Sequence, residues 1–206
     1  MSETTHGTSR RREQTRARLL EAAHEVFGEV GMDAASVEAI CERAGFTRGA
    51  FYSNFESKDE LFLALVTRLA EDKLDEVAGR VREIGPDDMT DLTALVHRVV
   101  GASFGAKMEP QLISEIRTQA LRDPRMAQAY LVWQSAMRER VAGIIGHVVD
   151  VYGIRLRLPV DDVAQLLVDV SDDTCVRATI EGRSAAEIGT VLNDRLGRLV
   201  GALEES

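Results

Sequence analysis

The residues best suited to chemistry gather between Ser36 and Lys58, in the stretch SVEAICERAGFTRGAFYSNFESK. Two short segments of helical period meet there at the turn AGFT, whose glycine can adopt a left-handed conformation. At roughly 100° per residue, the second segment turns Gly49 and Ser53 outward and leaves no bulky apolar side chain at the centre of that face. Such a surface suits close approach to hydrogen-bond acceptors, and a DNA major groove presents them.

Several polar side chains of this stretch have a predicted role at a nucleic acid. Arg48 can donate to guanine O6 and N7 or to phosphate, and Gly49 lets the backbone come close. We expect Tyr52 to position the helix on the phosphates, and the first backbone N–H groups after Ser36 to donate to another phosphate. The predicted DNA contacts are Arg10, Arg11, Arg12, Ser36, Thr47, Arg48, Gly49, Tyr52, Ser53, Asn54 and Lys58.

Arginine is concentrated ahead of this stretch. Between Thr8 and Arg18 the chain has five arginines and one acid, a local charge of +4 within a formal net charge of −9. Phosphate binding needs such a local excess of positive charge. We expect a flexible basic arm over residues 1–11, although a solvated tail at the start of a helix would have the same composition.

Helical periodicity predicts a small N-terminal domain over residues 12–57. Its helices are expected at 12–30, between Ser36 and Gly45, and at 48–54, and Ser36 and Thr47 have the side chains of N-caps. Six of the ten aromatic residues fall in the first 62 positions. A domain this small needs dense aromatic packing to bury enough surface, so the aromatic clustering supports a compact unit.

The remaining residues, 58–206, have the same helical period and no alternating run long enough to predict a strand. Asp123 and Pro124 pair an N-cap with proline at the first helical position, and Ser184 with Glu187 forms a capping box. We therefore expect an all-α protein of about nine helices, with a larger helical domain after the first one.

Composition and motifs exclude several other classes. The first 18 residues lack an apolar signal region and no apolar run is long enough to cross a membrane, so we expect a cytoplasmic protein with no membrane partner. Cys41 and Cys175 are too few for a disulfide framework or a cysteine-based zinc site. Without an HExxH, GxSxG or P-loop motif, we expect no metal, no cofactor and no catalysis.

From Thr15 to about Leu65 the chain resembles the N-terminal signature of TetR-family transcriptional regulators nearly position by position: TRARLLEAAHEVFGEVGMDAASVEAICERAGFTRGAFYSNFESKDELFLAL. Its departures are small, with Cys41 where a small residue is usual and Asn54 where histidine is frequent. The resemblance implies a homodimer that binds an inverted-repeat operator in double-stranded DNA, and a second domain for dimerisation and an unknown small-molecule ligand. It implies a repressor released by that ligand; the alternative is a small-molecule- or protein-binding dimer without transcriptional output.

The second domain gives weaker signals for its ligand, because methionine and aromatic stripes are more often plain core than pocket wall. Polar side chains within apolar periodicity are better candidates, since a buried polar group needs a partner. In the acidic run 169–177, Asp173 has the spacing of an ordinary ion pair with Arg177, and a cationic ligand is the alternative partner. The candidate ligand residues are His97, Phe104, Arg117, Tyr130, Trp133, Gln134, Met137, Gln165, Asp169 and Asp173.

By the same resemblance, the last two predicted helices, 161–181 and 184–203, pair with their dimer mates. An apolar stripe on the second helix fits a buried interface, although it fits the core of the monomer as well. The predicted interface residues are Ile188, Val191, Leu192, Leu196 and Leu199.

Overall fold

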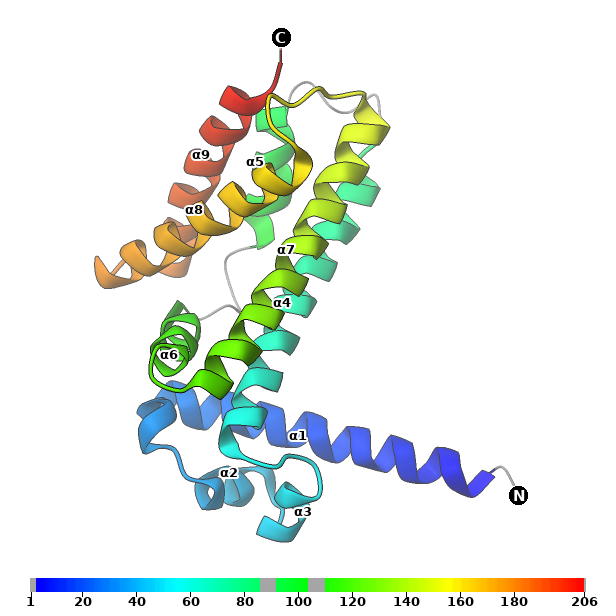
Figure 1. Cartoon of the computed structure of the whole chain (residues 1–206), viewed down its shortest axis with the longest axis vertical. Helices are drawn as coiled ribbons and strands as arrows, with labels where there is room; N and C mark the ends of the chain where they lie inside the picture. Colours follow the sequence, from blue (N-terminus) through cyan, green and yellow to red (C-terminus); the bar gives the residue numbers. More distant parts are fainter. Residues whose placement is uncertain (1–2, 86–91, 104–109, 206) are drawn as a thin grey trace. The chain divides into compact units, whose positions relative to one another are not determined.

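The computed structural model describes residues 3–85, 92–103 and 110–205, and their regular structure is α-helical (Figure 1). The all-α prediction of about nine helices is confirmed over these residues, where the one isolated β-bridge joins Leu156 to Glu204. None of the described helices is long and apolar enough to span a membrane. The helices are α1 (Glu3–Ala34), α2 (Val37–Ala44), α3 (Arg48–Tyr52), α4 (Lys58–Glu83), α5 (Leu92–Ser103), α6 (Pro110–Ala120), α7 (Pro124–Tyr152), α8 (Val160–Ile180) and α9 (Ala185–Leu203).

Local hydrogen bonds define the ends of α2 and α3. Ser36 Oγ accepts from the Ala39 N–H at 3.1 Å, and Thr47 Oγ1 accepts from the Ala50 N–H at 3.3 Å. Gly45 ends α2 with a φ of 72°, the left-handed conformation that costs glycine least. The predicted caps and turn are confirmed, because these bonds depend on neighbours in the sequence.

The chain divides into two compact units, Met1–Arg68 and Leu69–Ser206. The first unit therefore extends past the expected boundary at residue 57. Its core explains the difference: Phe62, on the second turn of α4, is fully buried and packs edge-to-face on Phe27 with ring centroids 5.2 Å apart. Phe51 and Phe55 are also buried, so the clustered aromatic residues form the core of this unit.

Helix α1 differs from its prediction at one end and agrees at the other. It begins at Glu3, so residues 3–11, predicted as a flexible arm, form its first turns. The segment contains no proline, and Arg10 and Arg11 favour continuation of the helix, whereas Gly7 and the threonines before it are weak helix formers. At the other end Gly31 has φ 76° and ψ 165°, a non-helical conformation at the predicted stop.

In the second unit, two long helices begin at the predicted caps. Asp123 Oδ1 accepts from the Arg125 N–H at 2.8 Å, with Pro124 in the first turn of α7. At α9, Ser184 and Glu187 form both bonds of the capping box. Each cap satisfies backbone donors that the first helical turn leaves unpaired, so the sequence signals of both starts are confirmed.

Helix α9 lies beside both α5 and α8 (Figure 1). A glycine permits its close approach to α5: a Cβ at position 197 would lie 3.0 Å from Thr93 Cγ2 and 3.1 Å from His97 Nε2. Thr93 Oγ1 instead donates to the Gly197 carbonyl at 3.3 Å. A side chain at position 197 would therefore force Thr93 and His97 to shift.

The predicted dimer stripe on α9 needs correction. Leu192 and Leu196 are 0% and 4% exposed within this one chain, so they belong to its own core and are not available to a partner. Ile188, Val191 and Leu199 are partly exposed. A core face and an interface face have the same helical period, which is why the sequence pattern could not separate them.

Candidate nucleic-acid interface and ligand cavity

Helix α3 presents a polar face to solvent. Its inner face is Phe51, which is 0% exposed and packs edge-to-face on the Tyr52 ring at a centroid distance of 5.2 Å. The expected orientation, with small and polar residues outward and Phe51 and Phe55 inward, is therefore the one observed. The exposed residues are Thr47, Arg48, Gly49, Tyr52 and Ser53.

Arg48 is held in place by two neighbours. Its Nη1 lies 2.7 Å from Glu38 Oε1, and its guanidinium carbon is 5.9 Å from the centre of the Tyr52 ring. Tyr52 and the negative charge of Glu38 raise the pKa of Arg48, so this side chain stays charged. The pair is exposed, and a phosphate or a guanine can compete for the same guanidinium.

Two arginines of α1 bind the carboxyl end of α3. Arg16 Nη1 donates to the Asn54 carbonyl at 2.8 Å, and its guanidinium lies 4.1 Å from the centre of the Phe55 ring. Arg12 Nη2 donates to the Ser53 carbonyl at 3.3 Å. These bonds satisfy carbonyls that a helix end leaves without partners, and they fix α3 against α1. Sequence reasoning missed this role, because each arginine is about forty residues away along the chain from the carbonyl that it binds.

A third arginine does the same for α2. Arg18 Nη2 donates to the Ala44 carbonyl at 2.9 Å, and its guanidinium stacks 4.8 Å from the Phe46 ring centre. Part of the predicted basic segment thus positions the helix-turn-helix. Arg10 and Arg11, by contrast, have exposed side chains on α1.

Asn54 does not lie on the exposed face where it was predicted. Only 7% of it is exposed, and its Nδ2 donates to the Ala50 carbonyl at 2.8 Å and to Ser53 Oγ at 3.3 Å. The asparagine therefore closes the end of α3. A phosphate contact by this side chain is incompatible with the observed burial.

Lys58 also has a structural role that the sequence did not predict. Its Nζ donates to the carbonyls of Met32 and Ala35, at 2.7 and 2.9 Å, where α1 ends. The side chain is half-buried, and its ammonium group is used inside the fold. Ser36, in contrast, is exposed at the start of α2, where its hydroxyl serves as the cap.

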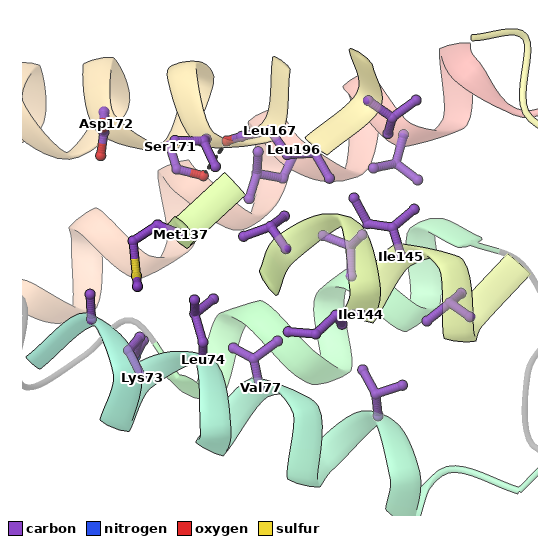
Figure 2. A pocket seen from close by; sticks show the side chains of 18 of the residues that line it. Lys73, Leu74, Val77, Met137, Ile144, Ile145, Leu167, Ser171, Asp172 and Leu196 are labelled. Atoms are coloured by element: carbon purple, nitrogen blue, oxygen red, sulfur yellow. Dashed lines mark hydrogen bonds between the residues drawn. The ribbon is translucent and has the colours of Figure 1, made fainter. Parts of the chain in front are cut away.

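The second unit contains a partly open cavity of about 230 Å³ whose wall includes α4, α7 and α8 (Figure 2). Four of the predicted ligand residues, all on one face of α7, line it: Tyr130, Trp133, Gln134 and Met137. Most of the other lining residues are aliphatic. Figure 2 shows Lys73, Met137 and Asp172 at one end, with Ile144 and Ile145 towards the other.

The other predicted ligand residues that the structure describes do not line this cavity. His97 is exposed and its Nδ1 lies 3.0 Å from Asn193 Nδ2. Gln165 and Asp169 are hydrogen-bonded to each other at 2.8 Å. Asp173 pairs with Arg177 at 3.2 Å, the ordinary ion pair that its spacing predicted. Phe104 lies outside the described residues.

Arg117 does not line the cavity but binds two residues that do. Its Nε donates to the Tyr130 hydroxyl at 2.9 Å and its Nη2 to Asp172 Oδ2 at 2.5 Å. Burial raises the pKa of Asp172, while the positive charge of Arg117 acts in the opposite direction. Arg117 therefore holds two lining side chains in place and balances the charge of one of them.

Sequence reasoning missed Lys73, which lines the cavity and is 7% exposed. Burial lowers the pKa of this lysine. A signal was available: Lys73 lies between Ala70 and Val77 at helical spacing, on the apolar stripe of α4, where a lysine is unusual. On α8, burial and the charge of Asp172 raise the pKa of Cys175 to about 11.

Comparison with known proteins shows what the helix-turn-helix segment is similar to. Residues 19–65 match the family model described as bacterial regulatory proteins, tetR family. The HTH-type transcriptional regulator UidR of Escherichia coli K12 is 32% identical over 113 residues. That match covers 55% of each chain, so this chain spans about half the length of that relative.

Solved structures share the fold over most of the chain. A TetR transcription regulator from Haloarcula marismortui has a TM-score of 0.69 at 16% identity, covering 94% of this chain and 100% of its own. FadR from Bacillus subtilis, solved with stearoyl-CoA, has a TM-score of 0.63 at 16% identity, covering 87% and 96%. At these identities the likeness concerns the fold.

Proposed function

We propose, from the premise that this chain belongs to the TetR family of helix-turn-helix transcriptional regulators, that it is a repressor which a small molecule releases from DNA. The first unit would bind an operator, and the second would bind the ligand and a second copy of the chain. The observation that carries the proposal is the outer face of α3, which is polar, built on small residues and backed by buried Phe51.

The chemistry of that face suits the major groove. Arg48 supplies a planar donor for guanine, and the Thr47 and Ser53 hydroxyls can reach base edges or phosphate oxygens. Gly49 is exposed, and a Cβ there would meet only Thr47 Oγ1 within 4 Å, at 3.7 Å. Packing within the chain therefore does not require glycine at this position. The missing side chain leaves room for a base or phosphate to approach the backbone.

A homodimer would read an inverted repeat. In helix-turn-helix dimers the two recognition helices enter successive major grooves about 34–36 Å apart, so a two-fold axis in the protein requires one in the operator. Ile188, Val191 and Leu199 remain candidates for the interface, since each is partly exposed on α9. Sedimentation of the purified chain tests the dimer directly.

Ligand release would follow from differential binding. A ligand shifts the protein only if it prefers the geometry that does not fit the operator, and DNA must then weaken ligand binding by the same factor. Such couplings are typically about 1–3 kcal/mol. The 230 Å³ cavity supports a small-molecule ligand, and FadR, of the same fold, was solved with stearoyl-CoA.

The decisive experiment is selection of bound duplexes from a random DNA pool at near-physiological salt, followed by sequencing. We expect an enriched inverted repeat, and we expect the Arg48→Ala, Tyr52→Ala double variant to enrich none. If the folded wild-type dimer enriches no sequence, the alternative of a binding dimer without transcriptional output becomes the better explanation.

A further inference from the structure

The wall of the cavity is almost wholly apolar at both ends. Valine, leucine and isoleucine side chains from α4, α5, α7, α8 and α9 make up most of it, and Figure 2 shows Leu74, Val77 and Ile144 among them. The lining residues that have a polar or charged group are Lys73, Tyr130, Trp133, Gln134, Ser171 and Asp172. Such a wall stabilises a bound molecule mainly through the apolar surface that leaves water.

Polar groups of the wall are bound to other groups of the chain or are out of reach. The Tyr130 hydroxyl accepts from Arg117 Nε at 2.9 Å, and Ser171 Oγ donates to the Leu167 carbonyl at 2.6 Å. Trp133 Nε1 has no hydrogen-bond partner in the described part of the chain, but this atom is buried beyond the reach of a water-sized group. The wall thus offers a ligand few free hydrogen-bonding groups.

Charged residues of both signs occur at one end of the cavity, where Figure 2 shows Lys73 and Asp172. Asp172 is paired with Arg117, and Lys73 already interacts within the chain, where the negative charge of Glu76 acts on it. An anion at this end would lie near Asp172 and a cation near Lys73, so an ion of either sign would meet a like charge. Since an ion that leaves water needs a partner to offset the loss of hydration, the wall disfavours both signs of charge.

We propose that the cavity binds an uncharged, mainly apolar molecule and discriminates against ions of either sign that have the same carbon skeleton. The ligand class is therefore a hydrocarbon, or an alcohol or ketone with a single polar group. Its apolar surface would lie against the aliphatic side chains of α4, α7 and α8. As the regulatory ligand this molecule rests on the proposed function, whereas its binding can be measured without DNA.

Four probes of one carbon skeleton test the discrimination by charge: methylcyclohexane, cyclohexylmethanol, cyclohexanecarboxylate and cyclohexylmethylamine. At neutral pH the third is an anion and the fourth a cation. Trp133, the single tryptophan of the chain, lines the cavity and reports binding through its fluorescence. We expect saturable binding of the two uncharged probes and at least tenfold weaker binding of both ions. Either ion binding as tightly as cyclohexylmethanol, or no saturable binding of the uncharged probes, would overturn the proposal.

Calorimetry at several temperatures gives a second measurement that does not depend on the tryptophan. Burial of apolar surface makes the heat capacity change of binding negative. We expect a negative heat capacity change for cyclohexylmethanol, because its ring would leave water for the aliphatic wall. A change of zero would contradict that contact.

Two valines of α7 make a matched pair of variants that tests where the probes bind. Val141 lines the cavity, whereas Val132 is 66% exposed and does not line it. Val141→Phe should weaken cyclohexylmethanol at least tenfold, because the added ring fills part of the cavity, and Val132→Phe should bind it like the wild type. Wild-type affinity of a folded Val141→Phe protein would contradict the proposal. If that variant does not fold, the ranking of the four probes on the wild-type protein decides.

Failure of this proposal can be told apart from failure of the proposed function, because the probes are titrated without DNA. If the uncharged probes bind as expected while the random pool gives no enriched operator, the repressor proposal fails and the ligand class stands. If an operator is enriched while an ion binds as tightly as cyclohexylmethanol, the ligand class fails and the repressor proposal stands.

Discussion

At the scale of single residues, Arg48 already has a partner in the free protein. The Arg48 and Glu38 side chains are 61% and 57% exposed, and an exposed ion pair contributes little to stability. DNA can therefore replace Glu38 as the partner at small cost. Variants of the two residues should change operator affinity in opposite directions.

Replacing Arg48 by alanine should weaken binding to the selected operator at least about 30-fold, because a bidentate contact to a base contributes about 1–3 kcal/mol and a dimer loses two such contacts. Fluorescence anisotropy of a labelled operator measures the change. Arg122→Ala, an exposed arginine of the second unit, serves as the control and should bind normally. An unchanged Kd for Arg48→Ala, with sedimentation of the dimer intact, would disprove the groove assignment.

Glu38→Gln should instead tighten operator binding several-fold, by about 1 kcal/mol at low salt, since it removes a negative charge near phosphate and frees Arg48. The gain should shrink as salt is added. Glu42→Gln, exposed on the same helix, is the matched control for the loss of one negative charge. Equal gains from the two variants would indicate net charge alone and no special role for the pair.

At the scale of the helices, the sequence predicted those features whose interacting residues are close together along the chain. The caps at Ser36, Asp123 and Ser184 involve neighbours within three residues, and all three are confirmed. Lys58 could not be assigned this way, because the carbonyls it binds belong to residues 23 and 26 positions earlier. The face of α9 was undetermined for a related reason: its period fixes which residues share a face, while the packing partner decides what covers Leu192.

The contact between α5 and α9 gives a test of packing. Gly197→Ala should lower the free energy of unfolding by about 1–3 kcal/mol, because its Cβ would meet Thr93 and His97 at 3.0–3.1 Å. Gly143→Ala, in α7 with nothing within 4 Å of the new Cβ, should raise it by about 0.5–1 kcal/mol. Urea denaturation measures both. Equal effects of the two substitutions would mean that α5 and α9 do not pack as described.

At the scale of the whole molecule, the cavity was predicted in part. Tyr130, Trp133 and Met137 share one stripe of one helix, so the sequence could predict that they lie on the same side of it and line the cavity together. Lys73 and Asp172 are 99 residues apart by number and come to one end of the cavity only when the helices pack. No pattern within a single helix indicates such a meeting.

Charge is distributed unevenly over the chain, and its contribution to DNA binding can be isolated. The Arg10→Gln, Arg11→Gln double variant should reduce the slope of log K against log salt by up to about 3.6, since each phosphate contact contributes about 0.9 and a dimer loses four arginines. Truncation of residues 1–12 is a poorer test, because Arg12 also binds the Ser53 carbonyl. An unchanged slope would mean that these exposed arginines do not touch DNA.

Helix α4 supplies Val66 to the buried core of the first unit and, within the next two turns, Ala70 and Lys73 to the cavity wall. In evolutionary terms, and on the proposed function, selection would act on these turns twice, for a stable helix-turn-helix unit and for the effector. Residues that line the cavity on α7 and α8, such as Met137 and Val163, belong to the core of the second unit only. Descendants of this protein that acquire a new effector should therefore change on α7 and α8 before they change on α4.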